Sequence, residues 1–421
     1  MKHLILLGDG MSDYPIDVLG GKTALEYAST PHMDRMAAEG TLGLIDTIPP
    51  GLPPGSDVAN LSVLGYNPKD CYTGRGPLEA ANMGVALSPE DIAFRCNLVT
   101  LRDGIDPVME DFTAGHISSL EAKAIIADLE IAIGSETFSF HPGVGYRHLL
   151  VWKGGESELV ATPPHDITDK AIGAYLPRGR GAEAINRLMR LSREFLADHP
   201  VNRERTERGL RPATSIWLWG QGRAPRIRKM MERFRIRGGI ISAVDLLNGI
   251  GVYAGLEVLP VEGATGYIDT NYRGKAEKAL AVLKELDLVF IHVEAPDEMG
   301  HEGNVEGKVK AIEDFDAQVV GTVLQGIGNL GPFRIAVLSD HPTPLSLKTH
   351  VADPSPFAVL SSLPGENQGR GTNFGEETAA LSGNLISPGY RFMETFIRNW
   401  RTFVGSDTRY KEKRQAYGKK D

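Results

Sequence analysis

The segment "DLVFIHVEAPDEMGH" (residues 287–301) joins an apolar run to two side chains that can bind a metal ion. The run is Leu288 to Ile291, and Asp297 and His301 follow it, four residues apart. Apolar runs without polar alternation are typical of strands covered on both faces, as in a parallel sheet between helix layers. Residues four apart on a helical turn face the same direction, so this carboxylate and this imidazole could grip one cation. The segment therefore predicts a buried strand that ends at a ligand site.

The same pattern recurs along the chain. Other short, almost entirely apolar runs lie at residues 3–7, 215–220, 237–243 and 333–339. Helical patterns occur at residues 31–39, 226–234, 275–286 and 305–327. Alternation of this kind predicts an α/β fold, in which a mainly parallel sheet is sandwiched by helices.

The middle of the chain has a different character. The chain has 421 residues, more than a single core usually organises. From Ile92 to Pro212 the strand-like pieces are shorter and have polar breaks, and a long charged helix and an Arg- and Glu-rich loop follow them. We interpret residues 93–211 as a smaller inserted α+β domain, and residues 1–92 and 212–421 as the core domain.

Composition excludes several classes of protein. The net charge of −9 argues against nucleic acid or an anionic membrane as the main partner. The longest apolar runs are too short for a membrane helix, and the N-terminal run reaches charged residues too soon for a signal peptide. Cys71 and Cys96 are the only cysteines, which agrees with a reducing compartment. We therefore expect a cytoplasmic protein, whose last residues, 409–421, form a solvated basic segment.

Polar residues that follow apolar runs are the place to look for chemistry, because open parallel sheets bind ligands beyond the carboxyl ends of their strands. Three runs end in this way, and the candidate ligands are Asp9, Asp297, His301, Asp340, His341 and His350. These six groups are too many for one tetrahedral ion, so we expect two. Mixed carboxylate and imidazole ligation fits manganese, zinc or magnesium. Two such ions form the usual clamp for phosphoryl chemistry.

Each candidate also has a structural interpretation. A lone Asp after a strand often forms a turn or caps a helix, and a lone His is often a satisfied core or surface group. The joint occurrence of Asp and His at several strand ends favours the metal site. His292 lies inside an apolar run and His3, His32 and His199 have no companion, so we interpret these four as structural.

A stiff Pro- and Gly-rich loop, "PPGLPPGSDVANLSVLGY" (residues 49–66), brings Ser56 to the start of a predicted helix. Ser56 could be the helix N-cap, a role that serine often fills. A helix N-terminus also favours a phosphate, and a serine acidified by a metal could act as a nucleophile. Ser62, in the helix interior, is a weaker candidate.

Several segments together resemble the archaeal-type, 2,3-bisphosphoglycerate-independent phosphoglycerate mutases of the alkaline phosphatase superfamily. They are "LLGDGMSD" (6–13), "PPGSDVANLSVLGYNP" (53–68), "YTGRGPLEAANMGV" (72–85), "DEMGHEGNVEGKVKAIEDFD" (297–316), "LSDHPTP" (338–344) and "KTH" (348–350). The resemblance implies interconversion of 3-phosphoglycerate and 2-phosphoglycerate by a two-domain enzyme with two divalent ions, Mn, Zn or Mg. It also implies the ligand sets. One ion would take Asp9, Ser56, Asp340 and His341, and the other Asp297, His301 and His350.

The resemblance further implies that Ser56 is phosphorylated by the substrate and that the freed glycerate reorients in a closed cleft before it takes the phosphoryl group back. Escape of glycerate would leave a phosphatase, so exclusion of water is part of the expected function. A phosphate and a carboxylate call for bidentate arginines. Our candidates for substrate binding are Arg75, Arg147, His148, His165, Arg180 and Arg223. His116 stands where the resemblance leads us to expect arginine, so we assign it no role.

Other functions share these residues. A related clade proposed as homoserine kinases, or a phosphomonoesterase, could use the same metal ligands, although the chain has no P-loop pattern for ATP. A binding module stabilised by the same ions is the alternative without catalysis. The chain could also form a homo-oligomer.

Overall fold

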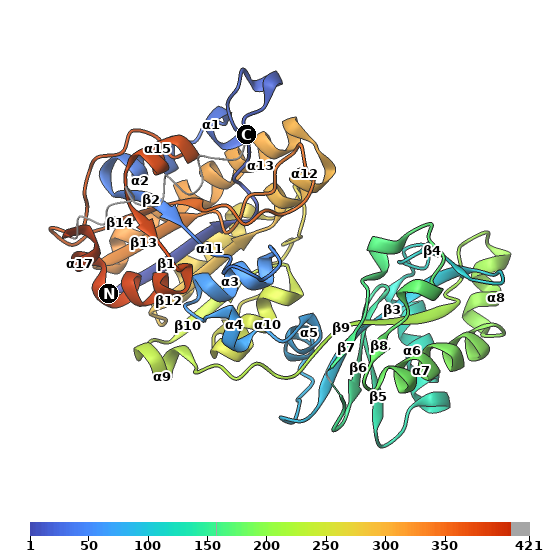
Figure 1. The fold of residues 1–421 in the computed structure, drawn as a ribbon. Coiled ribbons are helices and arrows are strands. Elements are labelled where there is room, and N and C mark those ends of the chain that lie inside the picture. Colours follow the sequence, from blue (N-terminus) through green and yellow to red (C-terminus); the bar gives the residue numbers. More distant parts are fainter. Residues whose placement is uncertain (157, 406–421) are drawn as a thin grey trace. The chain divides into compact units, whose positions relative to one another are not determined.

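The computed structural model describes residues 1–156 and 158–405, and the predicted solvated segment at 409–421 lies outside them. The chain divides into two compact units. Unit 1 comprises Met1–Tyr72 and the residues from Ile227 onwards, and unit 2 comprises Thr73–Arg226. Figure 1 labels the helices and strands of both units.

Unit 1 is built on an eight-stranded sheet with the strand order β11-β10-β12-β1-β13-β14-β2-β15. Its strands are β1 (Lys2–Gly8), β2 (Thr41–Ile45), β10 (Gly238–Ile241), β11 (Glu257–Val258), β12 (Leu288–Val293), β13 (Phe333–Leu338), β14 (Ser355–Ser361) and β15 (Leu385–Ile386). β1 runs parallel to both β12 and β13, while β14 is antiparallel to its neighbours β13 and β2. The sheet is therefore mainly parallel, as the buried apolar runs predict.

Helices cover both faces of this sheet. The helices of unit 1 are α1 (Ala24–Tyr27), α2 (Pro31–Glu39), α3 (Ser56–Val63), α4 (Pro68–Cys71), α9 (Met230–Phe234), α10 (Asp245–Ala254), α11 (Tyr272–Val282), α12 (Ala295–Glu302), α13 (Val305–Asp314), α14 (Gly321–Gly326), α15 (Glu376–Leu381), α16 (Phe392–Glu394) and α17 (Trp400–Gly405). A π-helical turn, Phe315–Val320, joins α13 to α14.

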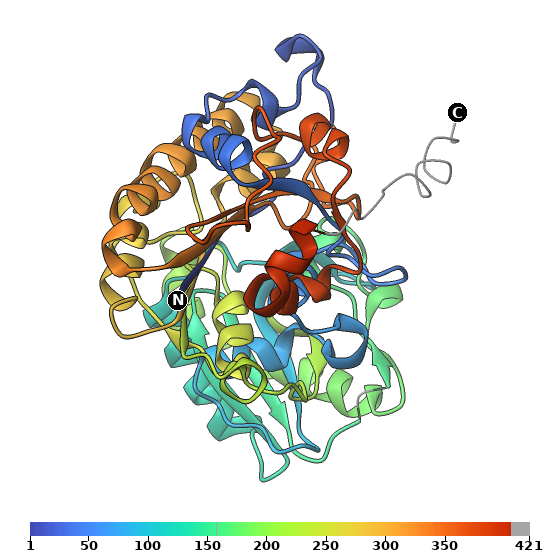
Figure 2. The same cartoon turned by 90° about the vertical axis from the view of Figure 1, so that its left-hand side faces the viewer.

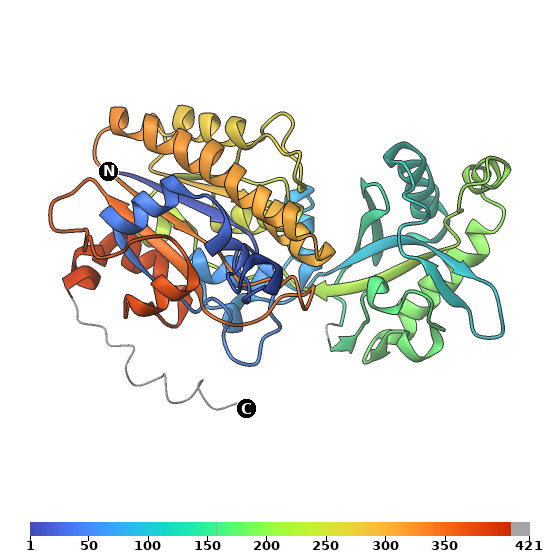
Figure 3. The same ribbon diagram turned by 90° about the horizontal axis from the view of Figure 1, so that it is seen from above.

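The two faces have separate cores. One face packs against α2, α11, α13 and α14 through the main hydrophobic cluster, which includes Leu4, Ile291 and Phe315. On the other face, β14 contributes Phe357 to an aromatic cluster with Trp400. The views in Figures 2 and 3 show the orange helices α13 and α14 on one side of β1 and the red helices α16 and α17 on the other.

Unit 2 contains an antiparallel sheet. Its strands are β3 (Ile92–Arg102), β4 (Val108–Asp111), β5 (Phe138–Val144), β6 (Arg147–Trp152) and β9 (Ser215–Gly222), and a separate small pair is formed by β7 (Leu159–Val160) and β8 (Arg178–Gly179). The helices are α5 (Arg75–Asn82), α6 (Ser119–Ile133), α7 (Ala182–Leu196) and α8 (Pro200–Glu207). β3 pairs with β4, β6 and β9, and all these pairs are antiparallel.

Two features differ from the sequence prediction. The segment 215–220, predicted as a strand of the parallel sheet, forms β9 and pairs antiparallel with β3 in unit 2. The predicted domain boundaries, after residues 92 and 211, fall instead after Tyr72 and Arg226. The reason is packing: α5 buries Ala80 against Ala93 and Leu149 of the antiparallel sheet, so the residues before β3 join unit 2.

Within residues 1–156 and 158–405, no helix combines the length and the apolar character that crossing a membrane requires. Cys71 and Cys96 are both buried and both have free thiols.

Candidate metal centre

Three adjacent strands of unit 1 bring the candidate ligands together. β12, β1 and β13 are neighbours and run parallel, so their carboxyl ends lie at the same edge of the sheet. Asp9 follows β1, Asp297 follows β12 on α12, and Asp340 follows β13. The structure groups the predicted residues into two clusters that could each hold an ion. The first cluster is Asp297, His301 and His350, and the second is Asp9, Asp340 and His341.

The first cluster is built on α12. This helix has Pro296 in its first turn and is capped at its C-terminus by Gly303, whose φ of +73° places it in the left-handed region. Its two turns place Asp297 and His301 on one side, with 3.1 Å between Asp297 Oδ2 and His301 Nε2. The loop after β13 adds His350, whose Nε2 lies 3.5 Å from Asp297 Oδ1.

The imidazoles of the first cluster are oriented for a cation. His301 Nδ1 lies 3.0 Å from the carbonyl oxygen of Lys348, which only accepts hydrogen bonds, so Nδ1 carries a proton and Nε2 faces the cluster. The Nε2 atoms of His301 and His350 are only 2.9 Å apart. The hydrogen bond to Asp297 raises the pKa of His301 to about 9 despite its burial. Positive charge is thus favoured at this point, which fits a metal ion.

The second cluster is fully buried. His341 Nε2 lies 3.4 Å from Asp9 Oδ1 and 3.6 Å from Asp340 Oδ2. Asp9 Oδ1 is buried and accepts no hydrogen bond from residues 1–156 and 158–405. Burial, followed by repulsion from Asp340 and Glu294, raises the pKa of Asp9 well above its usual value. Such a buried carboxylate oxygen, next to a second carboxylate and an imidazole, fits a divalent ion.

Ser56 is the first residue of α3, and its Oγ lies 3.2 Å from His341 Nε2. The N-cap position is occupied by Gly55, which makes no side-chain capping bond. The interpretation of Ser56 as an N-cap is therefore wrong. The hydroxyl lies against the second cluster, at the N-terminus of a helix where backbone N–H groups favour an anion.

Two further residues orient the ligands, and we did not predict them. Asn60 Nδ2 donates to Asp340 Oδ2 at 2.9 Å and to the carbonyl oxygen of Ser56 at the same distance. The Thr343 hydroxyl donates to Asp297 Oδ1 and lies 3.3 Å from His341 Nδ1, so it links the two clusters. Both residues hold ligand side chains in place without adding charge.

His292, interpreted as structural from the sequence, contacts the second cluster. Its Nε2 lies 2.8 Å from Asp9 Oδ2 and 3.4 Å from Glu294 Oε2. Asp9, His292 and Glu294 form a third group of possible ligands. Burial, followed by the charge of Lys275, lowers the pKa of His292 to about 3, so the ring is neutral.

In unit 2, three of the predicted substrate-binding residues interact electrostatically with Arg95. The guanidinium of Arg95 is buried, lies 4.5 Å over the ring of Trp219, and places its Nε 3.0 Å from Glu79. Burial lowers the pKa of Arg95, and the charges of Arg75 and Arg147 lower it further. His165 contacts Trp219 edge to face, and its pKa is lowered by burial and by the charges of Arg75 and Arg95. Arg75, Arg95, Arg147 and His165 are called the basic cluster below.

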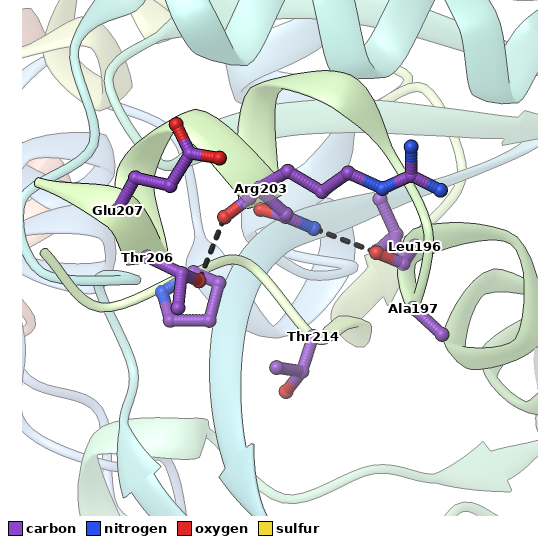
Figure 4. A pocket seen from close by; sticks show the side chains of 8 residues that line it. Leu196, Ala197, Arg203, Thr206, Glu207 and Thr214 are labelled. Atoms are coloured by element: carbon purple, nitrogen blue, oxygen red, sulfur yellow. Dashed lines mark hydrogen bonds between the residues drawn. The ribbon is translucent and has the colours of Figure 1, made fainter.

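The other three candidates lie apart from the basic cluster. His148 points into the hydrophobic core of unit 2 from the strand face opposite to Arg147, and only 1% of it is exposed. Arg180 is largely exposed and pairs with Glu156, and Arg223 pairs with Glu90. A pocket of about 400 Å³ also lies in unit 2, lined by Leu196, Ala197, Asn202, Arg203, Thr206, Glu207, Pro212 and Thr214, and none of the predicted site residues contributes to it (Figure 4).

Known proteins are similar to this chain in both sequence and fold. The family model described as 2,3-bisphosphoglycerate-independent phosphoglycerate mutase matches residues 37–202. A probable 2,3-bisphosphoglycerate-independent phosphoglycerate mutase of Geobacter sulfurreducens is 54% identical over 94% of this chain and 100% of its own length. The chain belongs to this mutase family. By family it is a phosphoglycerate mutase, an isomerase.

A second relative and a solved structure also match this mutase over most of its length. The 2,3-bisphosphoglycerate-independent phosphoglycerate mutase of Methanosarcina barkeri is 57% identical over 85% of this chain and 90% of its own. The solved structure of a Pyrococcus horikoshii protein has a TM-score of 0.79 and 30% identity, covering 96% of this chain and 97% of its own. The resemblance seen in the sequence is therefore confirmed at the level of the mutase family and of the α/β fold.

Proposed function

We propose that this mutase interconverts 3-phosphoglycerate and 2-phosphoglycerate through a phosphoserine at Ser56, at a site that holds two divalent metal ions. Family membership supports the substrate and the reaction. The observation that carries the mechanism is the position of the Ser56 hydroxyl, which starts α3 and lies 3.2 Å from His341 of the second cluster. A nucleophile, an anion-binding helix end and a ligand cluster thus meet at one place.

Asp9, Ser56, Asp340 and His341 would hold one ion, and Asp297, His301 and His350 the other. The oxygen and nitrogen donors suit manganese, zinc or magnesium. Ions bound there would neutralise phosphoryl oxygens and lower the pKa of the serine hydroxyl. Asn60 and Thr343 would keep the ligand carboxylates oriented during turnover.

The chain's own groups account for the transfer. Ser56 Oγ attacks phosphorus and gives up its proton, a bond forms between the serine oxygen and phosphorus, and the bond from phosphorus to the 3-oxygen of glycerate breaks as that oxygen takes up a proton. The backbone N–H groups at the start of α3 favour the phosphoryl charge. The 2-hydroxyl of the retained glycerate then attacks the phosphoserine and gives up its proton, and the serine oxygen leaves and takes up a proton to restore the hydroxyl. Water must be excluded between these two steps, because hydrolysis would make the mutase a phosphatase.

We propose that unit 1 carries this chemistry and, separately, that the basic cluster of unit 2 is an anion-binding group suited to a carboxylate or a phosphate. Guanidinium groups bind carboxylates and phosphates through paired hydrogen bonds, and Arg95 is preorganised by Trp219 and Glu79. The basic cluster thus contains three of the six predicted residues, Arg75, Arg147 and His165. The structure gives no corresponding support for His148, Arg180 or Arg223.

The alternatives drawn from the sequence lack an observation of their own. A homoserine kinase or a phosphomonoesterase would use the same clusters, but the relatives described above are named as phosphoglycerate mutases. We therefore retain the mutase as the single proposed function.

The test combines activity with detection of the intermediate. An enolase-coupled assay on 3-phosphoglycerate measures the mutase, and mass analysis after incubation with substrate detects phosphate on Ser56. Ser56→Ala should abolish both signals. Ser62→Ala is the matched control, because Ser62 is buried in the same helix and donates to the carbonyl oxygen of Thr47. Full turnover by Ser56→Ala would refute the phosphoserine mechanism.

A further inference from the structure

His292 occupies a buried position in the sheet directly beside the second cluster. It lies near the end of β12, opposite Leu7 of the parallel neighbour β1, and none of its surface is exposed. Two residues after Leu7, the backbone N–H of Asp9 donates to the carbonyl oxygen of Val293 at 2.9 Å. A buried imidazole is costly unless its ring nitrogens are hydrogen-bonded, so its partners indicate its role.

Both nitrogens of His292 belong to one chain of hydrogen bonds. The backbone N–H of Val244 donates to Ser242 Oγ at 3.0 Å, Ser242 Oγ lies 3.2 Å from His292 Nδ1, and His292 Nε2 lies 2.8 Å from Asp9 Oδ2. Because Ser242 Oγ accepts from Val244, its own hydroxyl proton is directed to His292 Nδ1, which leaves Nε2 to donate to Asp9 Oδ2. His292 Nδ1 then accepts from the Ser242 hydroxyl, whose oxygen in turn accepts from Val244.

These hydrogen bonds leave the two carboxylate oxygens of Asp9 with different contacts. Oδ2 is held by His292, while Oδ1 is buried, accepts no hydrogen bond from the described residues and lies 3.4 Å from His341 Nε2. We propose that His292 is a positioning residue that holds the Asp9 carboxylate with Oδ1 facing the second cluster. The role of Asp9 as an ion ligand rests on the proposed function, and the orientation of its carboxylate rests on these contacts.

A third ion between Asp9, His292 and Glu294 is the competing interpretation. The side chain of Glu294 interacts with Asp9, and its Oε2 lies 3.4 Å from His292 Nε2. An ion there would require Nε2 to give up the proton that it donates to Asp9. Lys275 also brings a positive charge to the same buried region, because its Nζ donates to the carbonyl oxygen of His292 at 3.0 Å and interacts electrostatically with Glu294. These contacts favour an imidazole that donates over one that binds an ion.

The test is a titration of the metal-free full-length chain with Mn²⁺ by calorimetry, with bound ions counted by elemental analysis. His292→Leu removes the donor at similar volume and should weaken one of the two ions by about 10- to 100-fold, the usual effect of losing a partner of a metal ligand. His292→Gln keeps a donor at the position of Nε2 and should retain most of the affinity. His301→Ala identifies which isotherm belongs to the first cluster, which His292→Leu should leave unchanged.

One further variant controls for a loss of folding, and another tests the hydrogen bond to His292 Nδ1. Ile291→Val changes an equally buried residue of the same strand and should lower the melting temperature without changing either affinity. Ser242→Ala removes the donor to Nδ1 and should weaken the same ion as His292→Leu, by a smaller factor.

Two results would overturn the proposal. One is unchanged affinity for both ions in His292→Leu. The other is a count of three bound ions in the natural chain that falls to two in this variant, because His292 would then be a ligand. The titration needs no substrate, so its outcome is independent of the mutase assay and of phosphate on Ser56, which decide the proposed function.

Discussion

Lys308 should be the most costly single replacement near the candidate metal centre. Neither Lys308 nor its partner Asp13 has an exposed side chain, and their Nζ and Oδ2 atoms are 2.8 Å apart. Lys308, on α13, also donates to the carbonyl oxygens of Ser12, at 3.2 Å, and Thr343, at 2.8 Å. These acceptors lie in the loops after β1 and β13, which carry the second cluster. One ammonium group thus forms hydrogen bonds to both of the loops that carry the ligand residues of the second cluster.

Lys308→Met should lower the free energy of unfolding of unit 1 by about 3–5 kcal/mol, the usual cost of leaving one partner of a buried ion pair alone. Methionine fills much of the lysine volume, so the loss is mainly electrostatic. Asp13 keeps two acceptor bonds, from the backbone N–H groups of Tyr14 at 2.8 Å and Leu345 at 3.2 Å, which argues against a larger loss. The replacement of Asp13 by Asn in the Lys308→Met background should recover part of the loss, because the uncompensated charge is removed.

The assay is equilibrium unfolding in urea of the metal-free chain, followed by circular dichroism and fitted with separate transitions for the two units. The matched control is Lys310→Met, two residues along the same helix. Its side chain is 62% exposed and pairs with Asp314, so the change should cost no more than about 0.5 kcal/mol. Equal effects of the two methionine variants would refute the reasoning, as would a double variant no more stable than Lys308→Met.

Four other outcomes are expected. Gly10→Ala should weaken one ion by at least about tenfold in a Mn²⁺ titration, because Gly10 has a φ of +59° and a Cβ there would collide with Asp297. Burial raises the pKa of Glu376 to about 7 from 4.5. The stabilising contribution of this group is therefore complete below pH 4.5 and is lost as the pH rises through 7. Glu376→Gln should flatten this part of the plot of unfolding free energy against pH, measured by urea unfolding at several pH values. Arg95→Ala should raise KM for 3-phosphoglycerate by at least about tenfold in the enolase-coupled assay, with the exposed Arg180→Ala as control. Removal of ions with a chelator should lower the melting temperature of the full chain, and added Mn²⁺ should restore it, because ligands that bind the folded state stabilise it.

The ligand edge of the sheet could be predicted because its signals are local. Each of β1, β12 and β13 is an apolar run that ends within four residues of a ligand residue, and parallel strands deliver their ends to one edge. The spacing of Asp297 and His301 needs only one helix. The strand β9 was assigned to the wrong sheet because this signal is limited. An apolar run indicates that a strand is buried, but it does not indicate which sheet the strand joins or in which direction it runs.

The supporting residues could not be predicted in this way, because their roles depend on contacts between distant segments. Asn60 is 280 positions from Asp340, and His292 is 283 positions from Asp9. In the sequence, Asn60 is a polar residue inside a helix and His292 an interruption of an apolar strand. Arg95 sits next to a core cysteine in β3, and only the folded sheet places it over Trp219. A polar residue within a buried run is the one signal that could have marked His292 and Arg95.

The contacts around the three aspartates suggest why neutral donors serve this site. Thr343 bonds Asp297, Asn60 bonds Asp340 and His292 bonds Asp9, and none of these donors neutralises the carboxylate that it holds. The two buried ammonium groups nearby, Lys308 and Lys275, donate instead to Asp13 and to backbone carbonyl oxygens. A cationic donor on Asp9 or Asp340 would satisfy the charge that should attract a metal ion. These two aspartates of the second cluster are therefore oriented by neutral donors, whereas Asp297 of the first cluster also faces the imidazole of His301, whose pKa it raises.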